Sequence, residues 1–402
     1  MQYKIHTSRT HMKKILGTLA EQGAYTGGFF LTQVIAARAL NLNDFALFSA
    51  LYSSVILLSI IHASTAADIL LMFGRRGQSL EPRSLLNILY PVVALAIVAT
   101  GYFAITTGRP LTVVLMPFFF MAFIMYWSLR SLAILNRKTS GLLVPPLLQV
   151  AVLSTLLPLE SASLDLIVAL IALCLGAPAL FFWRRLGTGK RYVIEPRDWV
   201  GFSISNSAAQ IVLWTMTHGM VIFLLASGDT AGSAFFRIVM TLILPAQYFG
   251  IALSNHYLPR LMKLRAEDNG AYYRQCAQLA LLGVGASAVY GGLLFLGGDR
   301  IPALIFGEAF SGIGLSQLAI LPVSLAVIQS GRTILKSSGF NHYVLLAMLV
   351  GLAGFTIHLI DHHYTLTTGA MLLGVNLTAA IIVLAVLLTA LLTRFHSTQE
   401  RA

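Results

Sequence analysis

The stretch RRLGTGKRYVIEPRD, residues 184–198, separates two long apolar regions and carries five of the chain's 27 Lys and Arg residues. Six apolar segments precede this linker and six follow it. A membrane-spanning helix needs about 20 largely apolar residues. We therefore expect twelve spans, near residues 15–39, 44–66, 84–106, 110–129, 140–159, 164–183, 199–227, 229–258, 274–297, 310–331, 342–360 and 364–393.

The basic residues alternate from one gap between spans to the next. Of the 27 Lys and Arg, 23 lie in the N-terminal tail, five alternate loops and the C-terminal tail. The intervening loops hold Arg109 and Arg300, with Arg38 at an edge. Because cytoplasmic loops retain Lys and Arg while short translocated loops exclude them, both termini are expected in the cytoplasm. The fold class predicted is an all-α integral membrane protein with twelve transmembrane helices.

The composition excludes several other classes of protein. Hydrophobic residues make up 57% and charged residues 10% of the chain, far from the charged quarter that is usual for soluble proteins. The net charge of +12 sits in loops that face one way, which indicates membrane orientation and attraction to anionic lipids and excludes nucleic acid as a partner. Cys174 and Cys276 both fall inside predicted spans, so no disulfide framework is expected.

The loops are too short to hold an enzyme. The longest translocated loop lies around residues 298–311, and the sequence contains no P-loop, HExxH, CxxC pair or Ser/His/Asp arrangement. We therefore expect no enzymatic activity, no cofactor and no bound metal. The function must lie inside the helix bundle.

Faint internal similarity supports two six-helix lobes, residues 1–190 and 191–402. The segment DFALFSALY, residues 44–52, opens span two, and DTAGSAFFR, residues 229–237, opens span eight. Arg130-Ser-Leu ends span four and Arg332-Thr-Ile ends span ten. With six spans per half, the halves are parallel repeats, and transporters built this way bind substrate at the interface of the halves and rock one against the other.

Span seven is the most polar of the twelve. One helical stripe holds Ser203, Ser207, Gln210, Trp214 and Thr217, flanked by Asn206 and His218. Within lipid such a stripe must face other helices or a water-filled cavity. Ser, Thr, Asn and Gln also serve as contacts between helices. Trp214 and His218 pack poorly at close helix contacts and favour the cavity, so we expect Asn206, Gln210, Trp214 and His218 among substrate-binding residues.

Arg237 is the one Lys or Arg within the core of a predicted span. A charge about two turns into span eight costs several kcal/mol, and a guanidinium suits a pyrophosphate or carboxylate through bidentate bonds. A structural ion pair or outward snorkelling is the alternative. Arg38, at the outer end of span one, either joins Arg237 in the substrate site or anchors the interface. Orientation alone explains Arg130 and Arg332.

Two carboxylates are candidates for coupling transport to an ion. Glu21 lies one to two turns from the cytoplasmic end of span one, and Asp68 lies near the inner end of span two. Each is either a proton- or cation-responsive group or a residue paired with a basic neighbour at the membrane surface.

Four stretches resemble the polysaccharide flippases (O-antigen and teichoic acid export) of the multidrug/oligosaccharidyl-lipid/polysaccharide (MOP) exporter superfamily. They are residues 36–48, AARALNLNDFALF; 232–237, GSAFFR; 258–261, LPRL; and 301–310, IPALIFGEAF. Asn41 and Ala46 stand where that family commonly has glycine. The resemblance runs through nearly the whole chain, and its motifs carry over Arg237 and Arg38.

The resemblance implies a flippase that moves an undecaprenyl-pyrophosphate-linked oligosaccharide across a bacterial inner membrane, with ion or proton coupling. A polysaccharide polymerase and glycosyltransferases of the same pathway would then be partners. Two other interpretations stay open: a cation- or proton-coupled drug or small-solute antiporter of the same superfamily, and a polysaccharide polymerase or ligase. The absence of acids from the outer half of the bundle weakens the first, and the short outer loops weaken the second.

Overall fold

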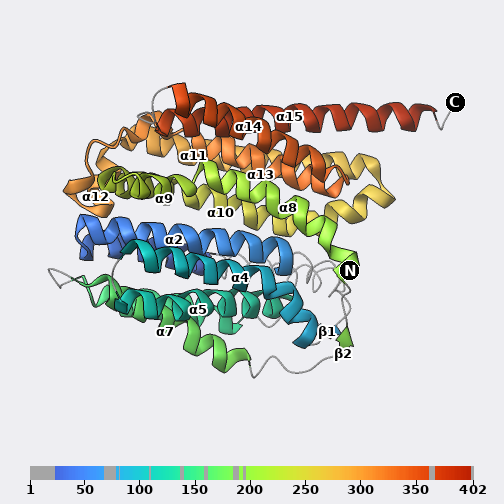
Figure 1. Ribbon diagram of the computed structural model, residues 1–402. Helices are drawn as coiled ribbons and strands as arrows, with labels where there is room; N and C mark the ends of the chain where they lie inside the picture. Colours follow the sequence, from blue (N-terminus) through green and yellow to red (C-terminus); the bar gives the residue numbers. More distant parts are fainter. Residues whose placement is uncertain are drawn as a thin grey trace, which may run out of the picture. The chain divides into compact units, whose positions relative to one another are not determined.

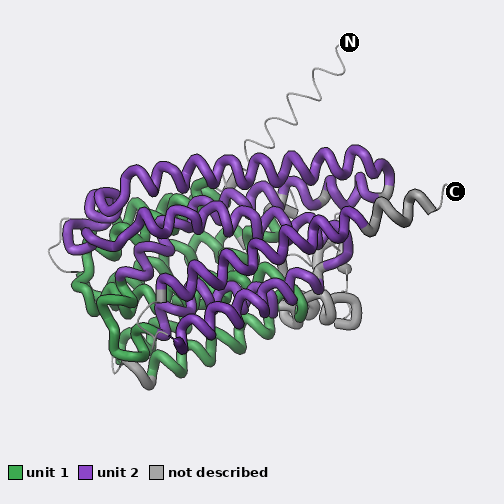
Figure 2. The backbone as a smooth tube through the Cα atoms, turned by 90° about the horizontal axis from the view of Figure 1, so that it is seen from above, with its two compact units in different colours: residues 1–207, 224–234 green, residues 208–223, 235–402 purple. Residues whose placement is uncertain are grey.

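The computed structural model describes residues 23–67, 78–80, 82–107, 110–135, 140–157, 162–183, 190–192, 196–361 and 367–399. Nearly all of these residues are helical. The chain forms two compact units, residues 1–207 with 224–234 and residues 208–223 with 235–402, called unit 1 and unit 2 (Figure 2). Three consecutive helices each pass from one unit to the other along the chain: α8 (Pro196–Met216), α9 (Gly219–Ala226) and α10 (Thr230–Glu267).

Unit 1 is built from apolar helices that follow one another in the first half of the sequence. The first covers residues 23–39 and is followed by α2 (Leu42–His62), a π-helical turn (Ala63–Ala67), α4 (Pro82–Thr107), α5 (Pro110–Leu135), a 3₁₀ turn (Ser140–Leu143), α6 (Val144–Ser154) and α7 (Leu164–Trp183). In this unit α5 packs against α7 and α4, and α2 packs against α4 and α5 (Figure 1).

Unit 2 holds the longer helices. The chain enters it through α8 (Pro196–Met216), α9 (Gly219–Ala226) and α10 (Thr230–Glu267), and continues with α11 (Asn269–Gly297), α12 (Arg300–Phe306), 3₁₀ turns at Glu308–Phe310 and Leu315–Leu318, α13 (Leu321–Ser337), α14 (Asn341–Asp361) and α15 (Thr367–Gln399). Within it α14 packs against α15, and α13 packs against both α11 and α15.

Polar side chains within the helices satisfy their own backbone. Asn41 caps α2, because its Oδ1 accepts a hydrogen bond from the Asp44 amide at 2.9 Å. Further along, the hydroxyls of Ser49 and Ser53 donate to carbonyls one turn back, at 2.6 and 2.8 Å. Such internal bonds allow serines to lie inside an apolar span, where no water is available to them.

The twelve predicted spans all coincide with helices in the described residues. Eight helices are long and apolar enough to cross a membrane, and the bent pair α8–α9 would make a ninth. Leu89–Ala104 and Val144–Ser154 are shorter apolar helices. The chain is therefore a multi-pass membrane protein.

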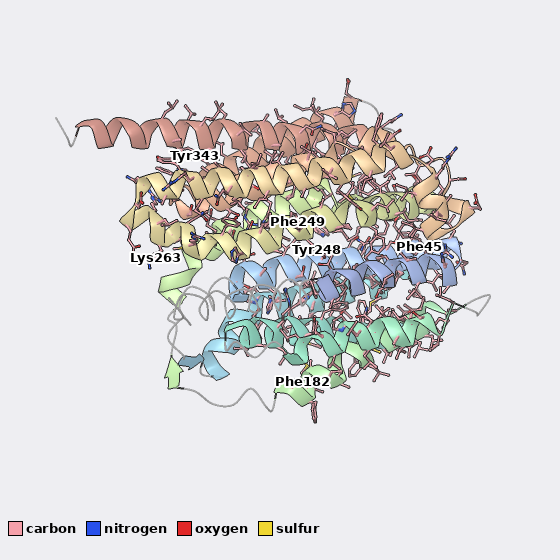
Figure 3. All side chains as sticks on the ribbon, turned by 180° about the vertical axis from the view of Figure 1, so that it is seen from behind. Phe45, Phe182, Tyr248, Phe249, Lys263 and Tyr343 are labelled. Carbon is pink, nitrogen blue, oxygen red and sulfur yellow. The ribbon has the colours of Figure 1, made fainter. Side chains whose placement is uncertain are left out.

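Several helices differ in extent from the predicted spans, and three of these differences concern spans seven, eight and ten. Span seven is broken at residues 217–218, with a bend of 49°. Span eight continues to Glu267, and Lys263, labelled in Figure 3, marks this extension of α10. Helix α13 starts at Leu321, because Gly312 and Gly314 adopt positive φ and the chain forms 3₁₀ turns before it. A short parallel pairing of Gln78–Leu80 with Lys190–Tyr192 was not predicted either.

The start of α11 allows a test of local helix stability. Asp268 is its N-cap, and the Asp268 carboxylate accepts a hydrogen bond from the Ala271 amide at 2.9 Å. Asp268→Ala should lower the free energy of unfolding by about 1 kcal/mol, because that amide loses its acceptor. Asp268→Ser should retain most of the stability. Reversible unfolding of the purified protein in mixed detergent would measure both, and equal stability of the two variants would contradict the capping role.

Candidate functional site

The seventh span is broken, and His218 lies in the break. Helix α8 ends at Met216 and α9 begins at Gly219. The Thr217 hydroxyl donates to the carbonyl of Leu213 at 2.8 Å and approaches that of Trp214 at 3.3 Å, so a side chain occupies carbonyls of the last helical turn. A Cβ at Gly219 would lie 3.2 Å from the Trp214 ring, so glycine there lets the indole pack against the break.

His218 faces Arg237, which lies on α10. Arg237 is 0% exposed and is among the largest fully buried side chains in the described structure, and His218 is 2% exposed. Arg237 Nη1 lies 3.4 Å from His218 Nδ1. Because a guanidinium can only donate, Nδ1 must accept, which places the proton of a neutral imidazole on Nε2. The Thr241 hydroxyl donates to the Arg237 backbone carbonyl at 2.9 Å.

The charge of this buried pair is positive. Among the buried Asp, Glu, His, Lys and Arg side chains of the described residues, the carboxylate is Asp44, which belongs to the cap of α2 in unit 1. The others are His62, His218 and Arg237. A guanidinium beside a neutral histidine offers only N–H donors to a ligand, an arrangement that suits a phosphate or carboxylate oxygen.

The rest of the predicted stripe on span seven divides between several roles. With its amide turned so that the oxygen faces α13, Gln210 accepts from Arg332 Nη2 at 2.8 Å and from Nε at 3.1 Å, and the same oxygen contacts Nη1. Trp214 packs on the helix break. Asn206 is 1% exposed and lies in the part of α8 that belongs to unit 1. Of the four candidates on this stripe, the structure therefore brings His218 to Arg237.

The remaining candidates lie in unit 1 or outside the described residues. Arg38 is exposed in the last turn of the first helix, in unit 1. Glu21 and Asp68, the coupling candidates, lie outside the described residues, as does the side chain of Ser203.

The polar face of span one is used for packing between helices in unit 1. The Tyr25 hydroxyl accepts from Trp127 Nε1 at 3.1 Å, and Gln149 Nε2 donates to the Thr32 hydroxyl at 2.7 Å. A Cβ at Gly28 would lie 2.9 Å from a side-chain carbon of Pro146, so the first helix and α6 approach closely. These contacts support helix–helix packing for this face.

The sequence interpretation missed a buried contact in unit 1. His62 Nε2 lies 3.0 Å from the Ser128 hydroxyl, and both side chains are buried. A π-helical turn follows directly at Ala63–Ala67, and such turns frequently mark functional positions. A histidine within an otherwise apolar span was the available signal.

The pairing of His218 with Arg237 also had a signal in the sequence. His218 lies ten residues before Gly228 and Arg237 nine residues after it. Gly228 has a φ of +88° and lies in the short turn between α9 and α10. Two residues at nearly equal distances from a helix-to-helix turn are expected to be neighbours across the hairpin.

Comparison with known proteins shows the fold. A eukaryotic MATE transporter matches with a TM-score of 0.64 at 14% identity, over 94% of this chain and 95% of that one. A multidrug resistance MATE family transporter of the MOP superfamily, in an outward-facing conformation, matches with a TM-score of 0.58 at 13% identity, over 97% of each chain. A MOP superfamily transporter from Pyrococcus furiosus matches with a TM-score of 0.54 at 14% identity, over 94% of this chain and 93% of that one. No family model and no curated protein matches the sequence.

Proposed function

We propose that this chain exports a lipid-linked oligosaccharide, an undecaprenyl-pyrophosphate repeat unit, across a bacterial inner membrane by alternating access. The observation that carries the proposal is the buried Arg237–His218 pair at a helix break. Discontinuous helices form substrate sites in many transporters, and an intramembrane arginine is a functional-site hypothesis by default. The pyrophosphate would bind the guanidinium, while the lipid tail stays in the bilayer.

The polarity of the pair favours an anionic substrate over a cationic drug. A buried carboxylate would favour a cationic drug, whereas the buried Asp, Glu, His, Lys and Arg side chains described in unit 2 are one arginine and one histidine. The published description of the Pyrococcus furiosus neighbour states that reversed polarity of its binding pocket suggests a different function. The same fold can thus accompany pockets of opposite polarity.

A drug or small-solute antiporter is the second candidate, and one observation favours it. The solved neighbours include transporters described as conferring multidrug resistance. Such an antiporter would need a coupling carboxylate, for which Glu21 and Asp68 are the candidates. The membrane fold is equally compatible with either substrate.

A deletion strain would separate the two functions. We expect it to accumulate lipid-linked oligosaccharide on the cytoplasmic leaflet and to lose surface polysaccharide, because assembly on the inner side continues without transfer. Its susceptibility to a panel of cationic drugs should not change. Altered drug efflux with normal surface polysaccharide would contradict the proposal and support the antiporter. Glycosyltransferase genes beside the gene for this protein would add support for the glycan substrate.

A further inference from the structure

Arg130 and Arg332, which the orientation rule alone was sufficient to explain, contact neighbouring helices. Arg130 lies five residues before the end of α5 at Leu135, and Arg332 lies five residues before the end of α13 at Ser337. At 1.5 Å per residue, each is about 7.5 Å inside its helix. Both residues are partly buried. The two arginines therefore occupy equivalent depths in spans four and ten.

In unit 1, Arg130 contacts the first helix. Its guanidinium carbon lies 4.5 Å from the centre of the Tyr25 ring, within the range of a cation–π interaction. Trp127, one turn earlier on α5, donates to the Tyr25 hydroxyl at 3.1 Å. Span four thus holds Tyr25 by both its ring face and its hydroxyl.

In unit 2, Arg332 makes the corresponding contact with the seventh span. With the Gln210 amide turned as above, its oxygen accepts from Arg332 Nη2 at 2.8 Å and from Nε at 3.1 Å, and it also contacts Nη1. The next residue, Thr333, donates to the Ser254 hydroxyl of α10 at 2.7 Å. Helix α13 therefore bonds at adjacent positions to α8, which leads to His218, and to α10, which carries Arg237.

We propose that Arg130 and Arg332 are equivalent positioning residues, each of which links the fourth span of its half to the first. We call the contact of Arg130 with Tyr25 and that of Arg332 with Gln210 the two ties. The Arg332 tie helps to set His218 against Arg237. A guanidinium suits both partners, because it stacks on an aromatic face and also donates several bonds to one oxygen. The consequence for transport rests on the proposed function. The tie itself can be measured without a substrate.

Two tryptophans provide separate reporters for the two ties. The chain has four Trp residues, so variants that retain only Trp127 or only Trp214 can be made with Phe at the other three positions. Arg332→Ala should shift the emission of Trp214 to longer wavelength and leave that of Trp127 unchanged. Arg130→Ala should do the reverse. Arg300→Ala, at an exposed arginine, should shift neither.

Lysine substitutions test the chemistry of each tie. Arg130→Lys should preserve the Trp127 spectrum, because an ammonium also binds a ring face. Arg332→Lys should shift Trp214 as the alanine variant does, because an ammonium cannot reproduce the fork of donors. Gln210→Leu should give the same Trp214 shift and add nothing to Arg332→Ala, as expected for two partners of one contact.

Several outcomes would overturn the inference. The inference fails if Arg130→Ala and Arg332→Ala leave the emission spectra of both tryptophans unchanged, or if either substitution shifts both of them. It also fails if the effects of Gln210→Leu and Arg332→Ala on Trp214 are additive. Export of surface polysaccharide should fall in Arg332→Ala and persist in Arg130→Lys. If the deletion strain exports normally, the proposed function fails, while the fluorescence results still decide the ties.

Discussion

Arg237→Ala is expected to abolish export of the surface polysaccharide while the protein remains in the membrane. The guanidinium is fully buried and faces His218, so its loss removes the charged donor of the site. Removing one partner of a buried charged hydrogen bond costs about 2–5 kcal/mol. That corresponds to roughly a 30-fold to several-thousand-fold loss of affinity for an anionic group.

Two further substitutions at this position separate charge from geometry. Arg237→Lys keeps the charge but loses the planar fork, so export should be reduced and not abolished. Arg237→Met keeps much of the side-chain volume without the charge and should behave as the alanine variant does. Arg300→Ala is the matched control, because Arg300 is exposed at the start of α12.

Export should be scored as surface polysaccharide per cell, normalised to the amount of protein in the membrane fraction. A membrane level close to wild type shows that the loss is functional and not a folding defect. Normal export by Arg237→Ala at that level would remove Arg237 from the substrate site. Loss of export in both Arg237→Ala and Arg300→Ala would indicate a general sensitivity to lost positive charge.

Hydropathy was sufficient to predict where the spans lie, but it could not predict the break within span seven. Each apolar segment must satisfy its backbone internally, so its length and position follow from composition. The bend in span seven depends instead on where the Thr217 hydroxyl bonds and on how the Trp214 ring packs at Gly219. These are contacts formed in the folded chain, and no proline marks the position in the sequence.

The candidate site could be predicted residue by residue but not contact by contact. Arg237 could be selected because a charge inside lipid is costly and therefore indicates a functional site. His218 could be selected because it flanks a polar stripe. The sequence could not show that Gln210 would accept from Arg332, since loop charge alone explained that arginine. Orientation rules state on which side a basic residue lies, whereas packing decides which side chain it contacts.

Gly351→Val is expected to have the largest effect on stability. A Cβ at Gly351 on α14 would overlap the Thr378 side chain of α15 and lie 2.7 Å from the Gly374 carbonyl oxygen. A Cβ at Gly374 would lie 3.0 Å from the Gly351 carbonyl oxygen, so the two glycines allow α14 and α15 to approach at the backbone. Small residues permit such close contacts between helices in membranes, where packing drives association.

The valine side chain would force these helices apart, because the obstructing atoms include backbone as well as side chain. Overpacking of this kind costs about 1–3 kcal/mol and more where the backbone must move, so we expect at least about 3 kcal/mol and a sharp fall in folded protein. Gly285→Val on α11 is the matched control, since a Cβ there meets nothing within 4 Å. Both substitutions place the same β-branched residue within a spanning helix, so intrinsic helix propensity cancels between them.

Thermal unfolding of the purified variants and their recovery from membranes would measure the difference. Thr378→Ala should restore part of the stability of Gly351→Val, because it removes the side-chain obstruction and leaves the Gly374 carbonyl in place. Such a rescue requires direct contact, since substitutions without shared partners add independently. Equal stability of Gly351→Val and Gly285→Val would show that α14 and α15 do not approach at these glycines, and the packing described for that part of unit 2 would then be wrong.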